Sequence, residues 1–400
     1  MKSAEPLPNA TYVAFRLTDD QEQILDAADK FARRELHPLQ QRMDDEEWWP
    51  PQLMPSLGTV GFLGVTAPSR FGGSDGDFFT SGLIAQGLAR WNPAAALSHI
   101  AHDNLCLNNI ARNGNEDQKR KYLPGLCDGS KVGALALTEP GAGSDALGSM
   151  ATTARREGDF FILNGRKLFI TNGPVADLVL VYAKTDRARG AKGISAFIVE
   201  KGFEGFSVAQ KLDKMGFRGS PTGELVFDDC KVPAENLVGL ENMGVAVVMS
   251  GLDLERAIVA MLNVGMAERA LDLAIEYANT RQQFGKRIAE FQLVRGKIAE
   301  MYVGVETAKT FCYRVLAEAN ALEQGGGGRG EIHKLTAASI LYAAETCSRV
   351  CNDAVQIFGG MGYMRETEVN RLYRAAKLLE IGAGTTEIRK LIISQELLGN

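Results

Sequence analysis

Residues 159–171 read Asp-Phe-Phe-Ile-Leu-Asn-Gly-Arg-Lys-Leu-Phe-Ile-Thr. Asn164-Gly165 stands between two β-prone runs, 160–163 and 167–171, and Asn-Gly in this setting is a strong signal of a β-hairpin. We therefore predict two antiparallel strands joined by a tight turn at Asn164-Gly165. Further β-prone runs follow at 178–182, 196–200 and 224–227. Short antiparallel strands in this number favour a small barrel or sandwich.

The sequence on either side of these strands has a helical pattern. Gln21 follows Thr18 by three residues, which is the spacing of an N-terminal capping box, and apolar residues then recur at helical spacing. Beyond residue 240, a Gly-rich stretch at 324–330 predicts a flexible connection between two long helices. The long segments with apolar stripes, enough for a four-helix bundle, begin near Val245, Phe291, Ile332 and Glu366.

The order of helices, strands and helices argues against a doubly wound nucleotide-binding fold, in which the two kinds of element would alternate. We expect a mainly α protein with a central β domain. The expected boundaries are a helical domain over 1–130, a β domain over 131–240 and a four-helix bundle over 241–400.

The composition is that of a soluble globular protein with no general attraction to nucleic acid. The 400 residues carry 44 Lys and Arg against 49 Asp and Glu, a formal net charge of −5. No run approaches ~20 apolar residues, so no membrane span is expected, and no signal or transit peptide is evident. The six cysteines form no Cys-x-x-Cys pair, so buried thiols, including Cys347 and Cys351, and a cytoplasmic location are expected.

Several familiar catalytic motifs are absent from the sequence. It has neither a Gly-x-Ser-x-Gly nucleophile elbow nor a His-Glu-x-x-His metal motif. The four histidines have no obvious partner at metal spacing, so structural or surface roles are expected for His37, His99, His102 and His333, and no metal. The Gly-rich motif at 137–145, Leu-Thr-Glu-Pro-Gly-Ala-Gly-Ser-Asp, could present N–H groups to a phosphate or a ring edge. Taken alone, it also suits an ordinary turn.

Together with four further blocks, this motif resembles the acyl-CoA dehydrogenase family, from the first predicted helix to the C-terminus. The blocks are Phe-Ile-Thr-Asn-Gly at 169–173, Met-Gly-Phe-Arg-Gly-Ser at 215–220, Arg-Gln-Gln-Phe-Gly at 281–285 and Gln-Ile-Phe-Gly-Gly-Met-Gly-Tyr at 356–363. Five blocks in the same order make a chance match negligible. The resemblance implies FAD as cofactor, a homotetramer, and an electron-transferring flavoprotein as the acceptor of electrons.

The resemblance also implies the reaction, α,β-dehydrogenation of an acyl-CoA to the 2-enoyl-CoA. A carboxylate removes the α-proton, N–H donors stabilise the developing enolate oxygen, and the flavin accepts the β-hydride. Most relatives carry the base in a Tyr-Glu-Gly-Thr motif, which here reads Gly-Ala-Gly-Thr at 382–385. Ala383 cannot accept a proton, although its backbone N–H can still serve the thioester oxygen.

The isovaleryl-CoA dehydrogenase subgroup carries its base on a bundle helix instead. Residues 249–256, Met-Ser-Gly-Leu-Asp-Leu-Glu-Arg, resemble that subgroup, so Glu255 is the expected base. The apolar neighbours Leu252, Leu254 and Ile258 are expected to raise its pKa. The alternative is a solvated helix carboxylate that pairs with Arg256 or Arg269.

The remaining site residues are carried over from the same resemblance, although several would also suit ordinary helix or core positions. The implied FAD contacts are Leu137, Thr138, Gly143 and Ser144; Phe169, Ile170 and Thr171; Arg281, Phe284 and Gln292, facing the FAD of a neighbouring subunit; Gln356, Gly359 and Gly360; and Thr385, Thr386 and Glu387. The implied acyl-CoA contacts are Ser144, Asp253, Leu254, Arg256, Val259, Gly382, Ala383 and Gly384.

The expected substrate is a short branched-chain acyl-CoA such as isovaleryl-CoA, as in leucine catabolism. Gly382 stands where a bulky aromatic residue is common, which widens the pocket for a methyl branch. Small residues at Ala246 and Ala257 leave a longer, terpenoid-type branched acyl-CoA as an alternative. A second alternative is that the protein is a flavin monooxygenase or oxidase on the same fold. One pocket methylene is worth only ~1–3 kcal/mol, so these residues do not rank the substrates.

Overall fold

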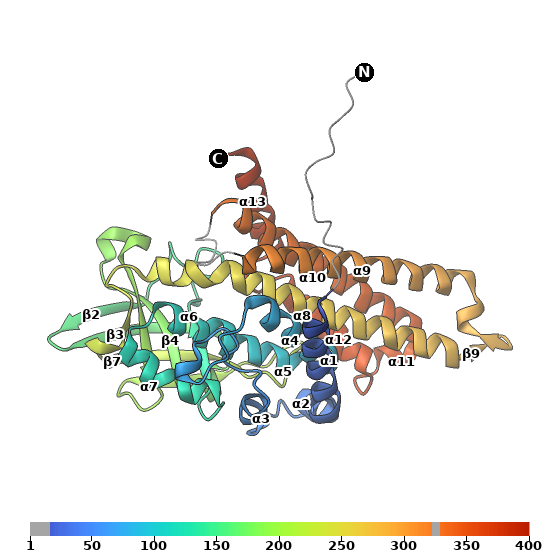
Figure 1. Cartoon of the computed structure of the whole chain (residues 1–400), viewed down its shortest axis with the longest axis horizontal. Coiled ribbons are helices and arrows are strands. Elements are labelled where there is room, and N and C mark those ends of the chain that lie inside the picture. Colours follow the sequence, from blue (N-terminus) through green and yellow to red (C-terminus); the bar gives the residue numbers. More distant parts are fainter. Residues whose placement is uncertain (1–16, 322–328, 400) are drawn as a thin grey trace, which may run out of the picture.

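The computed structural model describes residues 17–321 and 329–399. Figure 1 shows the strands gathered at one end of the molecule and the long C-terminal helices extending to the other, with the N-terminal helices between them. The N-terminal sixteen residues and most of the predicted Gly-rich connection lie outside the described residues. Among those described, no helix is both long and apolar enough to cross a membrane.

The N-terminal part of the chain is helical. The predicted capping box is confirmed: the Gln21 amide donates to Thr18 Oγ1 (3.3 Å), and the Thr18 amide donates to Gln21 Oε1 (3.0 Å). The chain is also helical over residues 101–113 and 116–127. The α-helices are α1 (Asp19–Phe31), α2 (Gln40–Asp45), α3 (Leu53–Thr59), α4 (Phe78–Trp91), α5 (Pro93–Ile100), α6 (Asn108–Asn113) and α7 (Glu116–Cys127).

The middle of the chain forms one sheet with strand order β6-β7-β3-β2-β4-β5-β8, and β1 pairs with β4 in parallel. Most other pairs are antiparallel. Apolar side chains from β1, β3, β4, β5 and β7 fill a core on one side of the sheet. The strands are β1 (Gly133–Ala136), β2 (Thr153–Glu157), β3 (Phe160–Thr171), β4 (Leu178–Lys184), β5 (Ile194–Glu200), β6 (Phe206–Lys211), β7 (Thr222–Pro233) and β8 (Leu237–Val238).

The predicted hairpin turn at Asn164-Gly165 is wrong, because β3 runs through both residues as a single strand. The turn lies earlier, at Gly158 (φ 58°), between β2 and β3. At Asn164-Gly165 the register with β7 shifts, and the Asn164 side chain exchanges hydrogen bonds with Asp229. A Cβ on Gly165 would lie 2.5 Å from Thr152 Oγ1. Glycine is therefore required here by a bulge and a close contact rather than by a chain reversal.

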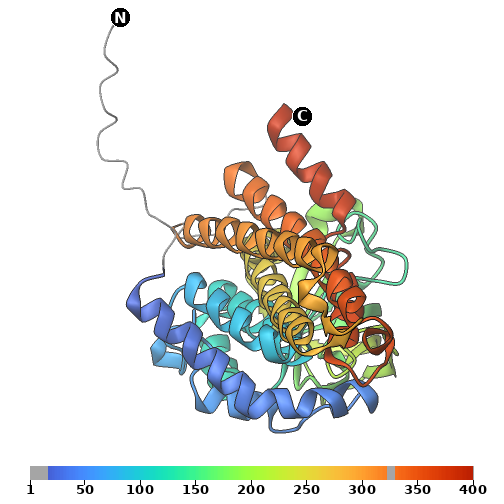
Figure 2. The same ribbon diagram turned by 90° about the vertical axis from the view of Figure 1, so that its right-hand side faces the viewer.

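Helices begin within a few residues of each of the four predicted starts. Three of them are long: α8 (Gly244–Thr280), α9 (Gln292–Asn320) and α10 (Gly330–Phe358). The segment predicted from Glu366 is divided by a turn into α12 (Glu368–Leu379) and α13 (Thr386–Leu398), and the short helix α11 (Gly360–Tyr363) precedes it. The antiparallel pair β9 (Gln282–Gln283) and β10 (Lys286–Arg287) joins α8 to α9. Figure 2 shows α9 and α10 lying across the remaining helices.

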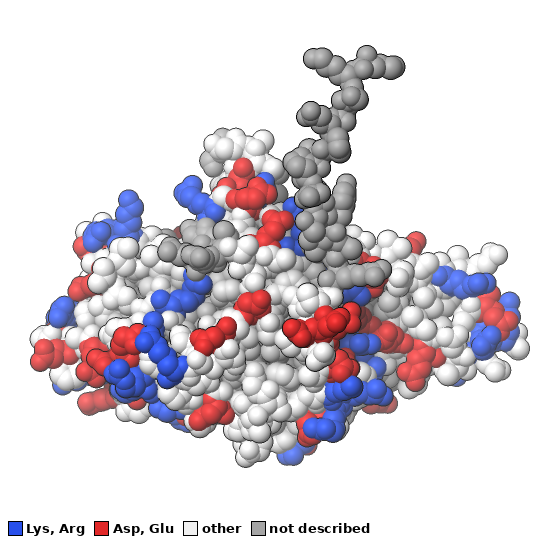
Figure 3. Space-filling view, in the orientation of Figure 1, with Lys and Arg blue, Asp and Glu red and all other residues white. Residues whose placement is uncertain are grey.

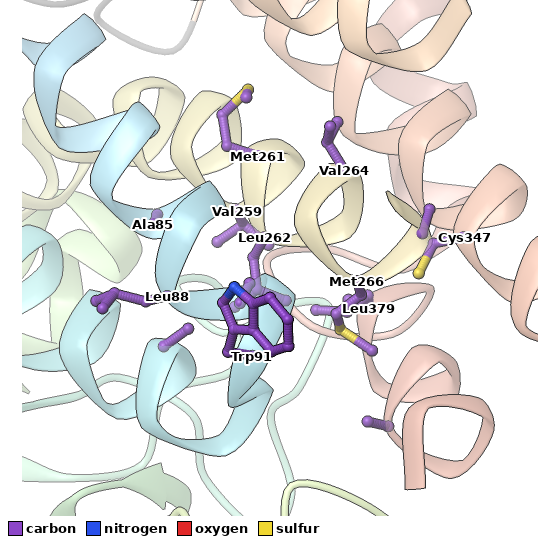
Figure 4. Close-up of a cluster of buried hydrophobic side chains, with 14 of the residues drawn as sticks. Ala85, Leu88, Trp91, Val259, Met261, Leu262, Val264, Met266, Cys347 and Leu379 are labelled. Atoms are coloured by element: carbon purple, nitrogen blue, oxygen red, sulfur yellow. The ribbon is translucent and has the colours of Figure 1, made fainter. Parts of the chain in front are cut away.

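Helix α8 is the central element of the helical core, since it is buried on all sides over most of its length. In Figure 4, Val259 and Leu262 of α8 lie near Trp91 of α4, and Met266 lies beside Leu379 of α12. These side chains belong to one continuous apolar cluster that joins the N-terminal helices to the bundle. The cluster fixes α8, and with it every side chain that α8 presents toward the sheet.

The cysteines and two of the histidines are structural, as predicted. All six cysteines are buried free thiols, and the Cys347 and Cys351 sulfurs are 3.9 Å apart. His99 Nε2 lies 2.7 Å from the Phe62 carbonyl oxygen, and His102 Nε2 lies 2.9 Å from the Leu126 carbonyl oxygen. Each of these two rings therefore links two parts of the N-terminal helical region.

A half-buried carboxylate, Glu368, connects the two helical regions at the start of α12. Arg269 of α8 donates to both of its oxygens (2.9 and 2.7 Å), and His37 Nε2 lies 3.1 Å away. Burial alone would raise the pKa of Glu368, but the hydrogen bonds from His37 and Arg269 lower it to about 2. The charged carboxylate is thus strongly favoured in the folded state.

We expect this network to lose its stabilising effect in acid. The folded pKa of Glu368 lies below its ordinary value of 4.5, so the contribution is complete above pH 4.5 and is lost as the pH falls toward 2. The difference in unfolding free energy between wild type and Glu368→Gln, about 3 kcal/mol at neutral pH, should shrink over that range in urea titrations. Glu318→Gln, which removes an exposed ion pair with Arg314, should change stability by under about 1 kcal/mol. A constant difference for Glu368→Gln at every pH would contradict this account.

Candidate active site

The Gly-rich loop after β1 is anchored to strand β3 at several points. The Leu168 amide donates to the Thr138 carbonyl (2.9 Å), and Lys167 Nζ donates to the Leu137 carbonyl (3.1 Å). Lys167 also forms an ion pair with Glu139 (2.9 Å), in which both side chains are at most 4% exposed. Leu137 and Thr138 are thereby held beside the 168–171 segment. Neither Lys167 nor Glu139 was predicted as important, because an ion pair between distant residues leaves no local pattern.

The surface of this loop fits a flat, partly polar group. Phe169 lies at a β-bulge with φ 62°, and its side chain is 64% exposed. Packing within the chain therefore explains neither the strained backbone of Phe169 nor the exposure of its aromatic ring. A Cβ on Gly141 or Gly143 would meet no atom within 4 Å. Their backbone is therefore open to a ligand, and Ser144 is exposed beside them. These features suit the edge and face of an isoalloxazine ring.

Two of the expected cofactor residues on β3 are placed differently from Phe169. Ile170 is 3% exposed and belongs to the apolar core of the sheet, so its side chain does not face the loop surface. Thr171 is partly buried and pairs with Thr222 of β7. Any contact of Ile170 with a cofactor would have to come from its backbone.

Glu255 lies about three turns into α8, one turn after Gly251, and is partly buried. Burial raises the pKa of Glu255 to about 7, against the opposing charges of Arg256 and Arg389. The direction of this shift agrees with the effect expected from its apolar neighbours. The carboxylate also acts electrostatically on the buried Tyr182 of β4, whose pKa is raised by burial first and then by Cys106 and Glu255. Glu255 is therefore a desolvated acid between the sheet and the last helix.

The alternative of a solvated Glu255 paired with a neighbouring arginine does not fit these contacts. Arg269 pairs with Glu368, and Arg256 donates to Asp253 Oδ1 (3.1 Å). Asp253 Oδ1 also lies 2.6 Å from His333 Nδ1 of α10. Asp253 and Arg256, two of the residues predicted to contact CoA, therefore belong to one buried cluster with His333. The role of His333 in this cluster was not predicted.

The turn between α12 and α13 lies against this cluster. Arg256 Nε donates to the Ala383 carbonyl (3.4 Å), so the structure brings the 382–384 turn next to Arg256 of α8. Ala383 has φ 56° and Gly384 has φ 94°. A second arginine that was not predicted, Arg389 of α13, holds the same turn from its own side. Thr385 caps α13 through a hydrogen bond from the Ile388 amide, with Thr386 and Glu387 in the first turn.

The two remaining acyl-CoA candidates on α8 are buried. Leu254 packs with Ala319 and Ile332, and Val259 lies in the main helical core one turn after Glu255. Gly382 has more space: a Cβ there would approach nothing nearer than the Leu378 carbonyl at 3.5 Å. Ala246 is exposed at the start of α8.

A second set of expected cofactor residues lies at the opposite end of α8. This helix has 37 residues, a length of about 55 Å, and Figure 1 shows β9 at the end farthest from the sheet. Within one chain, these residues are therefore far from the Gly-rich loop. All of them are exposed, and Phe284 is 91% exposed. The set consists of Arg281, Phe284, Gln292, Gln356, Gly359 and Gly360.

A hollow of about 470 Å³ opens elsewhere, between α1, α4, α8 and α9. Its charged walls are paired with one another, for example Arg90 with Asp29 and Lys309 with Glu268. On the face drawn in Figure 3, acidic and basic side chains are interspersed. Within residues 17–321 and 329–399, no group of three or more His, Cys, Asp or Glu side chains could hold a metal ion.

Three family models match the chain in succession. They describe the N-terminal domain of acyl-CoA dehydrogenase (residues 18–130), its middle domain (residues 134–230) and its C-terminal domain (residues 242–398).

Individual proteins of this kind are similar over nearly the whole chain. A relative named isovaleryl-CoA dehydrogenase, mitochondrial, from Pongo abelii is 46% identical, covering 95% of this chain and 89% of that protein. The solved structure of butyryl-CoA dehydrogenase from Megasphaera elsdenii is 39% identical with a TM-score of 0.91, covering 96% of this chain and all of that one. A structure titled FAD complex of PigA is 32% identical with a TM-score of 0.90, covering 96% and 99% of the two chains.

Proposed function

The chain belongs to the acyl-CoA dehydrogenase family, as an FAD-dependent oxidoreductase, and we propose that its substrate is a short branched-chain acyl-CoA of the isovaleryl type. The observation that carries this proposal is the exchange of carboxylates between two positions. Ala383 stands in the turn where most relatives have the base, and a desolvated Glu255 lies on α8 beside that turn.

The proposed reaction uses two groups of this chain. Glu255 removes the α-proton, and its raised pKa makes it a stronger base than an ordinary carboxylate while leaving it largely ionised at slightly alkaline pH. The Ala383 N–H donates to the thioester oxygen as negative charge develops there. FAD, when bound, supplies the hydride acceptor. The protein provides the base, the donor and the exclusion of water.

Binding of FAD and CoA is proposed for two surfaces. The Gly-rich loop and Phe169 would hold the flavin ring. Ser144, Asp253 and Arg256 would contact the CoA part of the substrate. The exposed far-end set around Phe284 would contact the cofactor of another copy, which supports a homo-oligomer, expected to be a tetramer. An electron-transferring flavoprotein as acceptor and a cytoplasmic location remain proposals from the sequence.

Gly382 supports the branched-chain assignment. Its missing side chain leaves space in the turn next to the expected α- and β-carbons. A linear short chain, as in the name of the Megasphaera elsdenii structure, is the competing assignment.

An anaerobic panel tests the substrate. We expect isovaleryl-CoA to bleach the flavin of the purified holoenzyme with a higher catalytic efficiency than butyryl-, octanoyl- or citronellyl-CoA. Gly382→Val should fill the space in the turn and lower the efficiency for isovaleryl-CoA more than for butyryl-CoA, about tenfold if the loss matches one or two methylenes. Preference of the wild type for butyryl-CoA would contradict the branched-chain assignment, and no bleaching by any acyl-CoA would contradict the proposed function.

A further inference from the structure

The turn that carries Ala383 is held in a conformation that its sequence does not favour. Ala383 has φ 56°, in the left-handed region, where a Cβ is unfavourable. A strained backbone persists only where surrounding contacts fix it. The contacts that fix this turn are therefore of interest for the reaction, because the N–H of Ala383 is the proposed oxyanion donor.

Arg389 supplies the closest of these contacts from inside α13. Its side chain is fully buried, and Nη2 donates to the Leu379 carbonyl (2.8 Å) and to the Gly382 carbonyl (2.5 Å). Its Nε and Nη1 have no hydrogen-bond partner among the described residues. A buried arginine with donors left over is costly, so packing alone does not explain why this position is charged.

The Gly382 carbonyl belongs to the same peptide group as the Ala383 N–H. In a planar trans peptide the C=O and N–H bonds point in opposite directions. A donor that fixes Gly382 O therefore fixes the direction of the Ala383 N–H. A charged donor also polarises the amide, which strengthens the hydrogen bond that the N–H can give on its far side.

Arg256 holds the next peptide group along the chain. Its Nε donates to the Ala383 carbonyl (3.4 Å) from α8. The peptide groups on both sides of Ala383 are thus each held by a buried arginine, one from α8 and one from α13. The turn cannot rotate at Ala383 without breaking one of these two contacts.

We infer that Arg389 is a positioning residue for the oxyanion donor: by holding Gly382 O it aims and polarises the Ala383 N–H toward the thioester oxygen. The inference rests on the proposed function, in which that N–H stabilises the enolate. Arg389 acts through the 382–383 peptide and does not itself touch the substrate.

The same guanidinium has a second effect, on the base. The charged or titratable groups that act on Glu255 are Arg256 of its own helix, Arg389 of α13 and Tyr182 of β4. Burial raises the pKa of Glu255, while Arg256 and then Arg389 lower it. Removing the charge at position 389 should therefore move the pKa of Glu255 further upward.

The test uses the FAD-loaded enzyme with isovaleryl-CoA, in anaerobic stopped-flow measurements from pH 5.5 to 9. In Arg389→Gln we expect the limiting rate of flavin reduction to fall by about 10²-fold, the loss typical of one oxyanion donor. The half-saturating acyl-CoA concentration should change little, and the midpoint of the pH profile should move to higher pH. Arg389→Lys keeps the charge without the planar geometry, so it should restore the midpoint and part of the rate.

A second readout does not depend on hydride transfer. Acetoacetyl-CoA is a 1,3-dicarbonyl that ionises to an enolate, and its absorbance shows how strongly the site favours that form. Arg389→Gln should bind it with a smaller enolate fraction than wild type. Arg374→Met serves as the control, because Arg374 holds Asp44 and the Met215 carbonyl away from the turn. It should lower the melting temperature while leaving the rate, the pH midpoint and the enolate fraction unchanged.

The inference is overturned if Arg389→Gln behaves like Arg374→Met, with a lower melting temperature but wild-type rate, pH midpoint and enolate fraction. If Arg389→Gln does not fold, a full wild-type rate in Arg389→Lys overturns it, and a reduced rate with an unchanged midpoint supports it. Failure of the proposed function is distinct, since it would appear as wild-type enzyme that no acyl-CoA bleaches.

Discussion

Replacing Glu255 with glutamine should slow flavin reduction by isovaleryl-CoA by about 10²–10⁴-fold, the range for loss of a general base. Glutamine has nearly the same shape but cannot accept the α-proton. The variant should therefore still bind FAD and acyl-CoA, and only the bleaching step should fail. Anaerobic stopped-flow absorbance of the flavin measures this directly.

The control for Glu255→Gln is another carboxylate on the same helix. Glu268 of α8 interacts with Gln86 and Lys309, more than three turns away from Glu255. Glu268→Gln should therefore leave the rate of flavin reduction unchanged. Retention of a rate close to wild type in Glu255→Gln would falsify the assignment of the base.

The pH dependence of the wild-type rate follows from the same carboxylate. Only the ionised form accepts a proton, and the pKa of Glu255 is raised to about 7. The rate should therefore rise as the pH increases through 7. Bound substrate should exclude more water from Glu255 and move this midpoint to higher pH. In Glu255→Asp, the shorter side chain should give a slower proton transfer and a displaced midpoint.

Replacing Lys167 with methionine should lower the free energy of unfolding by about 3–5 kcal/mol, the cost of leaving one partner of a buried ion pair unpaired. Lys167 is fully buried, and it reaches both Glu139 and the Leu137 carbonyl. Without it, the Glu139 carboxylate would keep the amides of Ala151 and Thr152 but lose its positively charged partner. Urea denaturation of the holoenzyme measures the loss.

Two further variants separate the ion pair from simple loss of packing. In Lys167→Met/Glu139→Gln the unpaired charge is gone, so part of the lost stability should return. Lys121→Met removes a more exposed pair with Glu200 and should cost under about 1 kcal/mol. Glu139→Gln alone completes the comparison. If the loss of stability in the double variant equals the sum of the losses in Lys167→Met and Glu139→Gln, the charges of Lys167 and Glu139 are not coupled.

The extent to which the sequence predicted this molecule depends on whether the signal was local. The capping box at Thr18 and the start of α8 near Val245 are local patterns, and both are confirmed. Asn164-Gly165 is also local, but its glycine serves a close contact with Thr152, which lies just before β2. The Asn-Gly motif therefore gave a wrong turn prediction, because a tertiary contact requires glycine at position 165 just as a turn would.

The site shows the same division. Glu255 was predicted as the base because residues 249–256 resemble a subgroup that carries its base on a bundle helix, and because Ala383 cannot accept a proton. Arg389 could not be found in this way, since its role comes from carbonyl groups that carry no sequence signal. The available clue was a charged residue between Ile388 and Lys390, in a helix that also carries Leu391, Ile392 and Ile393, and this pattern also fits an ordinary amphipathic helix.

The left-handed backbone at Ala383 has an evolutionary consequence. The steric cost of that conformation comes from the Cβ, which alanine and glutamate share. Exchanging one for the other leaves the conformational cost nearly the same, so the backbone is no barrier to regaining an acid there. Replacing Ala383 with glutamate would therefore not require the turn to be remodelled.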